Sequence, residues 1–236
     1  MTTLALLGGR LPWLATAPRP TEDARWLAAA VPPLAAGSQV LDVGCGSGMV
    51  GLVLALRTPG LQLWGVELQP ARVAEARCHA AWANVSARLI EADALTWRAP
   101  HPFPVVVSNP PFHAHRRGHH SPNPAKALAH GLPALAPWLQ AIRQALAPGG
   151  AAYVVLHASL QAELLDYATP HGGTLQLRPL ASHPARPPKR LLACWRPNLA
   201  VPCAISTLPV VPAYHTPLRE AVLRDGACLG AWGYGW

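Results

Sequence analysis

The chain has 236 residues, enough to bury the core of one large domain, and it combines 51% apolar with only 13% charged residues and a formal net charge of +8. Pro, Gly or His interrupts each apolar stretch well before the roughly 18 residues of a membrane span, and no positive charge precedes the first apolar run, which disfavours a spanning helix and a signal peptide. Five cysteines, odd in number and without a C-x-x-C pair, favour free thiols in a reducing cytoplasm over a disulfide framework.

Along the first half of the chain, helix-like segments alternate with apolar runs. A helix is predicted from about Thr21, a suitable N-cap, to Val31, where Pro32 and Pro33 end it. Strands and helices then alternate, with strands at 39–43, 61–66 and 87–91 and helices at 48–57 and 71–83. This alternation is typical of a doubly wound sheet.

The second half continues the pattern after a strand at 104–108 and a long polar loop at 113–130. The remaining predicted elements are a helix at 133–146, a strand at 151–156, a helix at 159–168, strands at 174–180 and 190–196, and a tail helix at 218–224. The predicted fold class is therefore α/β, with a doubly wound, mostly parallel seven-stranded sheet and helices on both faces.

A glycine-rich turn follows the first core strand, with the sequence Asp42-Val43-Gly44-Cys45-Gly46-Ser47-Gly48. Its glycines allow positive φ angles and a close approach of the backbone to a ligand, and the next helix offers free N–H groups. The spacing is G-x-G-x-G, whereas a dinucleotide site has G-x-G-x-x-G. An acid at Asp42 can also accept a hydrogen bond from a cationic amine, a group that a pyrophosphate lacks.

Two more carboxylates follow the next two strands. Glu67 ends the second core strand, where a carboxylate can reach both hydroxyls of a ribose, and Asp93 follows the third, where it can meet an adenine amine. Singly, each is more often a solvated charge at a strand end. Together with Asp42 they favour a nucleoside ligand with a positive charge.

The segment Asn109-Pro110-Pro111-Phe112 directly follows the fourth core strand. It brings together an amide, two residues with fixed φ and an aromatic ring, which suits a pocket for a flat ring bearing an amine. Together with Asp42 and Glu67, the segment is more than an ordinary Pro-rich turn. If this strand lies beside the first, the segment faces the glycine-rich turn.

The excess positive charge is confined to one part of the chain. Residues 1–93 hold seven acids and seven bases, whereas residues 94–236 hold four acids and twelve bases. No carboxylate side chain occurs between Ala94 and Ala162. The cations in that window are Arg98, Arg116, Arg117, Lys126 and Arg143. A positive surface around a pocket favours a nucleic acid as partner, and the alternative is a charge excess that only aids solubility.

With these motifs the chain resembles the class I methyltransferases that depend on S-adenosylmethionine. DVGCGSG is similar to their first cofactor motif, Glu67 and Asp93 to the acids that bind ribose and adenine, and SNPPF to the motif of enzymes that methylate planar nitrogens. The segments SPNPAKALAH, KRLLACWRP and YHTPLREAVLRDG further resemble the bacterial tRNA (valine) adenine-N6 methyltransferases.

The resemblance implies one methyltransferase domain over 1–236, with an N-terminal segment and helix at 1–36, a cofactor-binding core at 37–197 and a C-terminal extension at 198–236. It implies S-adenosylmethionine as cofactor and RNA, in particular a tRNA anticodon loop, as partner. The implied cofactor-binding residues are Asp23, Asp42, Gly44, Cys45, Gly46, Gly48, Glu67, Leu68, Asp93, Ala94 and Asn109. The implied catalytic residues are Asn109, Pro110, Pro111 and Phe112, and the substrate-binding residues are Phe112, His113, Arg116, Arg117 and Lys126.

Three alternatives stay open. Asn-Pro-Pro-Phe-His also resembles ribosomal-RNA guanine-N2 methyltransferases, and a protein glutamine-N5 methyltransferase uses the same Asn-Pro-Pro segment on a planar amide. A cofactor-binding but catalytically silent RNA-binding module is the third. No metal is expected, because no Cys or acid accompanies the histidines of the polar loop, which are His113, His115, His119 and His120.

Overall fold

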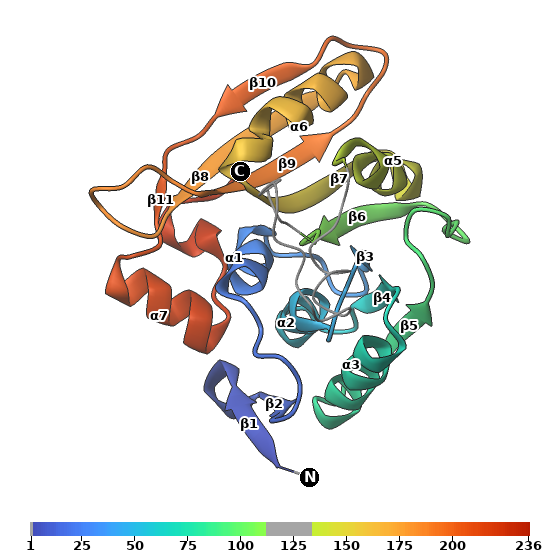
Figure 1. Cartoon of the computed structure of the whole chain (residues 1–236), viewed down its shortest axis with the longest axis vertical. Coiled ribbons are helices and arrows are strands. Elements are labelled where there is room, and N and C mark those ends of the chain that lie inside the picture. Colours follow the sequence, from blue (N-terminus) through green and yellow to red (C-terminus); the bar gives the residue numbers. More distant parts are fainter. Residues whose placement is uncertain (1, 112–133) are drawn as a thin grey trace, which may run out of the picture.

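A computed structural model describes residues 2–111 and 134–236. In this part of the chain the main sheet has nine strands in the order β10-β8-β9-β7-β6-β3-β4-β5, with β11 also paired to β8 (Figure 1). The strands are β3 (Gln39–Val43), β4 (Gln62–Glu67), β5 (Ala87–Glu91), β6 (Phe103–Ser108), β7 (Leu146–His157), β8 (Thr174–Ala181), β9 (Arg190–Arg196), β10 (Ala204–Thr207) and β11 (Val211–Pro212). From β5 to β7 all neighbours are parallel, and β9 is antiparallel to β7 and β8.

The α/β class and the mostly parallel sheet are confirmed, but the prediction of seven strands is wrong. The tail after Arg196 adds β10 and β11, both parallel to β8. These strands have only four and two residues, and Pro202, Pro209 and Pro212 interrupt the apolar residues of the tail, so no strand was predicted there. The expected adjacency of β3 and β6 is confirmed, with Asp42 opposite Val107.

Helices cover both faces of the sheet. The helices are α1 (Glu22–Ala30), α2 (Met49–Arg57), α3 (Pro70–Trp82), α5 (Ala136–Ala145), α6 (Gln161–Ala168) and α7 (Thr216–Asp225). One apolar core joins α1 and α2 to side chains such as Val40, and the other joins α5 and α6 to side chains such as Leu41. Successive residues of β3 therefore point into opposite cores, as a strand buried on both faces requires.

The start of α1 agrees with its predicted cap. The backbone N–H of Ala24 donates a hydrogen bond of 3.4 Å to the Thr21 hydroxyl, which satisfies one of the free amides of the first turn. Glu22 and Asp23 lie in that turn, where negative charge is favourable. Asp23 also lines the large cavity of the molecule.

A small N-terminal hairpin, β1 (Thr3–Leu6) and β2 (Leu11–Leu14), was not predicted. Its strands have four residues each and its turn depends on Gly8 and Gly9 at positive φ, so the sequence offers little periodicity. Trp13 of this hairpin is almost completely buried.

Within the described ranges, no helix combines the length and the apolar character needed to cross a membrane.

Candidate functional site

A cavity of about 750 Å³ opens above the carboxyl ends of β3, β4 and β6. This is the edge at which open α/β sheets bind ligands, and the volume lies in the range of small-molecule sites. Among its lining residues are most of the predicted ones: Asp23, Asp42, Gly44, Cys45, Gly46, Glu67, Leu68, Asp93, Ala94, Asn109, Pro110 and Pro111. The structure therefore brings together residues that are far apart in the sequence.

The glycine-rich turn forms the floor of the cavity. Gly44, Gly46 and Gly48 have φ angles of 70°, 54° and 92°, in the region that favours glycine. The amides of Gly44 and Cys45 both donate to the Val66 carbonyl, at 2.9 and 3.0 Å. Gly48, predicted as a cofactor-binding residue, does not line the cavity. It is the N-cap of α2, where it turns the chain into the helix.

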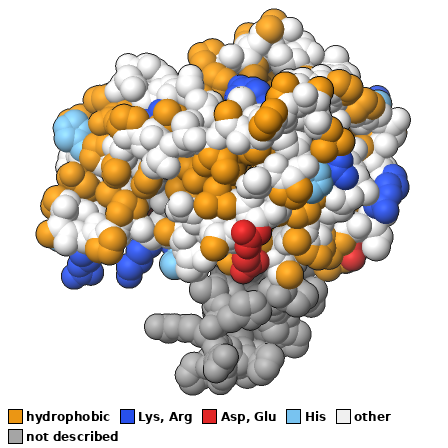
Figure 2. Space-filling model, turned by 90° about the horizontal axis from the view of Figure 1, so that it is seen from above, with side chains coloured by type: hydrophobic (Ala, Val, Ile, Leu, Met, Phe, Trp, Pro, Cys, Tyr) orange, Lys and Arg blue, Asp and Glu red, His pale blue; other side chains and the backbone are white. Residues whose placement is uncertain are grey.

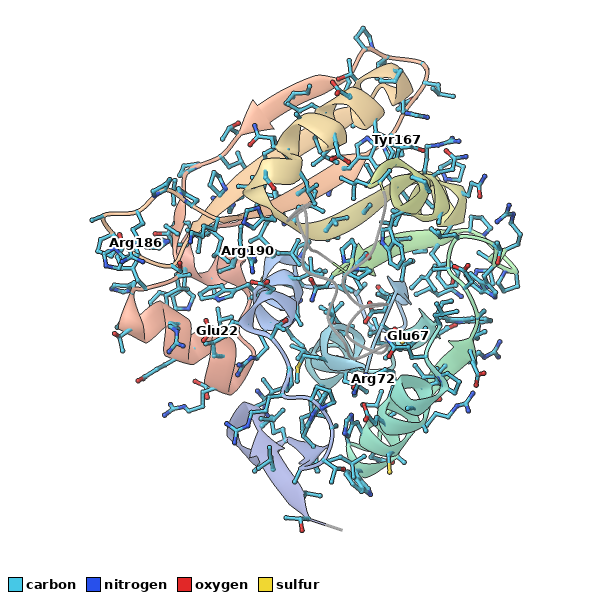
Figure 3. The ribbon with its side chains drawn as sticks, viewed as in Figure 1. Glu22, Glu67, Arg72, Tyr167, Arg186 and Arg190 are labelled. Carbon is cyan, nitrogen blue, oxygen red and sulfur yellow. The ribbon has the colours of Figure 1, made fainter. Side chains whose placement is uncertain are left out.

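Glu67 is held in place by two backbone amides. One carboxylate oxygen accepts the Gly46 N–H and the other accepts the Gln69 N–H, both at 2.9 Å. The side chain is buried to 8% exposure yet lines the cavity at the end of β4, near the centre of the view in Figure 3. Each oxygen keeps a second lone pair, so the carboxylate is oriented to accept two hydroxyl hydrogen bonds.

Asp93 is oriented in the same way. Its Oδ1 accepts the Leu95 N–H at 2.9 Å, and the structure shows no partner for Oδ2 among the described residues. The free oxygen is an acceptor in the cavity wall, as an amine of an adenine ring requires.

Asp42 lies deeper than the sequence suggested. Its side chain is only 2% exposed, and Oδ2 accepts the Gly51 N–H of α2 at 3.1 Å. Burial raises the pKa of this carboxyl from 3.8 to about 7, with the nearby charge of Glu67 adding to the rise. The partner that the structure gives Asp42 is thus a helix amide, and contact with a cationic amine stays a prediction.

Asp23 forms an ion pair across the cavity wall. The distance from its Oδ2 to the Nε atom of Arg190 is 2.7 Å, and both side chains line the cavity. Figure 3 shows Arg190 beside α1, so the first turn of α1 is tied to the start of β9. Sequence reasoning missed Arg190 as a site residue, although it lies within the segment KRLLACWRP.

Trp13 and Trp138 also line the cavity and were not predicted. The Trp138 indole lies under the glycine-rich turn: a Cβ at Gly44 would be 2.8 Å from its Cζ2 atom. Gly44 is therefore required both for its φ and for this space. A buried Trp next to a glycine motif has no signature in the sequence, since the two are 94 positions apart.

Five predicted site residues lie outside the described residues: Phe112, His113, Arg116, Arg117 and Lys126. The remaining histidines of the polar loop also lie outside them. Within residues 2–111 and 134–236 there is no group of three His, Cys, Asp or Glu side chains that could hold a metal.

The residues present fit S-adenosylmethionine. Four carboxylates, Asp23, Asp42, Glu67 and Asp93, line this one cavity, although the whole chain has only 11 acids. Three arginines, Arg19, Arg72 and Arg190, also line the cavity, but Arg190 pairs with Asp23 and Arg72 pairs with Glu75. The remaining carboxylates suit a ligand with a cationic sulfonium and an amine better than a pyrophosphate. Glu67 and Asp93 present oriented acceptors for ribose hydroxyls and an adenine amine. The turn at Gly44 leaves no space for a side chain.

Comparison with known proteins agrees with this geometry. The profile of the family described as "Methyltransferase small domain" matches residues 22–166. A relative from Musicola paradisiaca is 31% identical over 202 residues, which is 82% of this chain and 75% of the relative. Another from Erwinia tasmaniensis is 31% identical over 175 residues, 70% of each chain. Both relatives are named tRNA1(Val) (adenine(37)-N6)-methyltransferase.

Solved structures share the fold at lower identity. A predicted O-methyltransferase from Agrobacterium tumefaciens superposes with a TM-score of 0.66 over 87% of this chain and 97% of its own, at 18% identity. A putative class I S-adenosylmethionine-dependent methyltransferase from Listeria monocytogenes gives a TM-score of 0.57 over 85% and 68%, at 13% identity. The cavity, the family profile and these relatives lead to one conclusion: the chain belongs to the methyltransferase small domain family and is an S-adenosylmethionine-dependent methyltransferase.

Proposed function

We propose that this enzyme methylates the exocyclic N6 of an adenine in RNA, in the anticodon loop of a tRNA. The observation that carries the proposal is that Asn109 and Pro110 line the same cavity as Glu67 and Asp93. A hydrogen-bond acceptor for a planar amine therefore lies in the space that suits the cofactor. Relatives with that activity in their names support the choice of adenine and tRNA.

The proposed chemistry needs no strong base. The lone pair of a purine amine is delocalised into the ring, which makes the amine a poor nucleophile. The Asn109 side-chain carbonyl and the Pro110 backbone carbonyl would accept hydrogen bonds from the two N–H groups of the amine and favour a more pyramidal nitrogen. The cofactor supplies an electrophilic methyl group on sulfur. Transfer of that methyl group to the amine nitrogen would release the demethylated cofactor, and the proton that the amine loses would pass to water.

The charges of the chain support RNA as the carrier of the base. The positive excess lies entirely in residues 94–236. An anticodon-loop base is partly unstacked already, so its extrusion into a pocket costs less than extrusion from a duplex. A guanine-N2 activity on ribosomal RNA is the second candidate, favoured by the sequence Asn-Pro-Pro-Phe-His, and a glutamine side chain of a protein is a third.

The experiment uses Asn109→Ala with Asn198→Ala as the matched control, since Asn198 is an exposed asparagine outside the cavity. Methyl transfer from labelled S-adenosylmethionine to unmodified tRNA should fall at least a hundredfold in Asn109→Ala, while calorimetric binding of the cofactor is retained. The control should keep its activity. Loss of cofactor binding in Asn109→Ala, or full activity, would contradict the role assigned to Asn109.

A further inference from the structure

The loop between β8 and β9, residues 182–189, projects from the same edge of the sheet as the cavity. His157 ends β7 opposite Arg190, which begins β9, and Leu180 near the end of β8 is also opposite Arg190. Because β7 is parallel to β6 and β3, its last residue marks the carboxyl edge. Figure 3 shows Arg190 beside α1 and Arg186 farther out on this loop.

The loop carries cations and no carboxylate. Its sequence is Ser-His-Pro-Ala-Arg-Pro-Pro-Lys, and Arg186 and Lys189 are both exposed. Among the described residues neither of them forms a salt bridge. Figure 2 shows a face on which Lys and Arg occur at several separate places and carboxylates are few. These two cations are thus available to an external anion.

No acidic side chain in this part of the sequence compensates the charge. Between Asp166 and Glu220 the chain has no Asp or Glu. The carboxylate that does approach is Asp23, and it is already paired with Arg190. Burial lowers the pKa of His157, and the positive charges of Arg190 and Lys189 lower it further, against a smaller opposing effect of Asp23. The local potential at the base of the loop is therefore positive.

The loop is also stiff and continuous with the cavity. Pro184, Pro187 and Pro188 fix φ at three of its eight positions, and the Ala185 N–H donates to His183 Nδ1 at 3.1 Å. The Lys189 carbonyl accepts the Ala158 N–H at 3.0 Å, which anchors the base of the loop beside β7. Arg190, the next residue, lines the cavity. A polyanion lying on the loop would therefore lie next to the cavity.

We propose that the loop 182–189 is a phosphate-binding surface that holds the RNA backbone next to the cavity, with Arg186 and Lys189 as its contacts. This inference rests on the proposed function, because it takes RNA as the substrate. The contacts are to phosphate, so they position the RNA without reading its sequence. They would add to any contacts that Arg116, Arg117 and Lys126 make.

The test compares two double variants that each remove two exposed cations. The loop variant combines Arg186→Ala with Lys189→Ala. The control variant combines Arg77→Ala on α3 with Arg88→Ala on β5, at the opposite edge of the sheet from β8. Binding of an unmodified tRNA transcript is measured by fluorescence anisotropy over a range of salt. The loop variant should bind about tenfold more weakly, and the slope of log Kd against log salt should fall by about 1.4 to 1.8.

Cofactor binding and the rate of methyl transfer at saturating RNA should be unchanged in the loop variant, because neither side chain lines the cavity. Equal affinities and equal slopes for the two double variants would overturn the inference while leaving the proposed function intact. If the unaltered enzyme methylates protein and neither binds nor methylates RNA, the proposed function itself fails. Thermal unfolding of each variant shows that it is folded.

Discussion

The Trp138 indole Nε1 donates a hydrogen bond of 2.8 Å to the hydroxyl of Ser108. The same hydroxyl donates to the Val43 carbonyl, also at 2.8 Å, and Ser108 is completely buried. These two hydrogen bonds connect α5 to the ends of β6 and β3. Ser108, which takes part in both, directly precedes Asn109. The position of the proposed catalytic amide thus depends on a side chain 29 residues away.

Ser108→Ala should lower both stability and turnover. The substitution leaves the buried Trp138 N–H without its partner, which costs about 1 to 3 kcal/mol in the free energy of unfolding. Urea denaturation measures this cost, and kcat should fall with KM for S-adenosylmethionine little changed. Ser206→Ala, at an exposed hydroxyl on β10, is the control and should leave stability within about 0.5 kcal/mol. If Ser108→Ala leaves both the free energy of unfolding and kcat unchanged, the hydrogen bond between Trp138 and Ser108 does not position Asn109.

Glu67→Gln should weaken cofactor binding by about ten- to a hundredfold. The amide nitrogen of glutamine cannot accept the N–H that one Glu67 oxygen now accepts, and a neutral acceptor binds hydroxyls less strongly than a carboxylate does. Isothermal titration with S-adenosylmethionine measures the change. Glu91→Gln is a matched control, because Glu91 pairs with Glu67 in the sheet but is exposed outside the cavity. Equal losses in both variants would argue against the assignment of Glu67.

Asp42 should make stability fall as pH rises from about 4 to 7. Its pKa is about 7 in the folded protein and 3.8 ordinarily, so the folded state keeps a proton that the unfolded chain has released. The stabilising effect of that proton is complete below pH 4 and is lost by about pH 7, with a slope of up to about 1.4 kcal/mol per pH unit. Asp42→Asn should remove this dependence. Parallel pH profiles of ΔG of unfolding for the two proteins would contradict it.

His79 should have the opposite pH dependence. The Leu14 N–H donates to Nε2 at 3.0 Å, so the ring proton lies on Nδ1, which donates to the Ser47 carbonyl at 2.9 Å. The ring stacks on Trp13 with centroids 3.8 Å apart, and burial lowers its pKa from 6.5. As pH falls below 6.5 the unfolded chain takes up a proton that the folded state resists, and stability is lost.

The measurement for His79 is the cost of His79→Ala in ΔG of unfolding at two pH values. At pH 8 the variant loses the stack and both hydrogen bonds, for about 2 to 4 kcal/mol. At pH 5.5 the difference in ΔG of unfolding should shrink by up to about 1.4 kcal/mol, because only the unaltered protein is destabilised by keeping the ring neutral. A cost that is the same at both pH values would contradict the assigned protonation state.

The sequence predicted the parts of the site that depend on short spacing. The turn at Gly44, Gly46 and Gly48 and the strand-end acids Glu67 and Asp93 follow from local periodicity and from the rule that parallel strands end at one edge. Other contacts at and near the site join distant segments and were not predicted: Arg190 with Asp23, Trp138 with Ser108, and Trp13 with His79. Periodicity contains no information about which buried side chains meet, and the two strands of the tail, with four and two residues, are too short to show it.

The most direct test of the account is product analysis of methyl transfer. Purified enzyme is incubated with labelled S-adenosylmethionine and, separately, unmodified total tRNA, ribosomal RNA, DNA and protein, and each product is digested and identified. The account predicts label in tRNA as N6-methyladenosine, at the anticodon loop, and its loss in Asn109→Ala. Label found only as N2-methylguanosine, or only in protein, would contradict it.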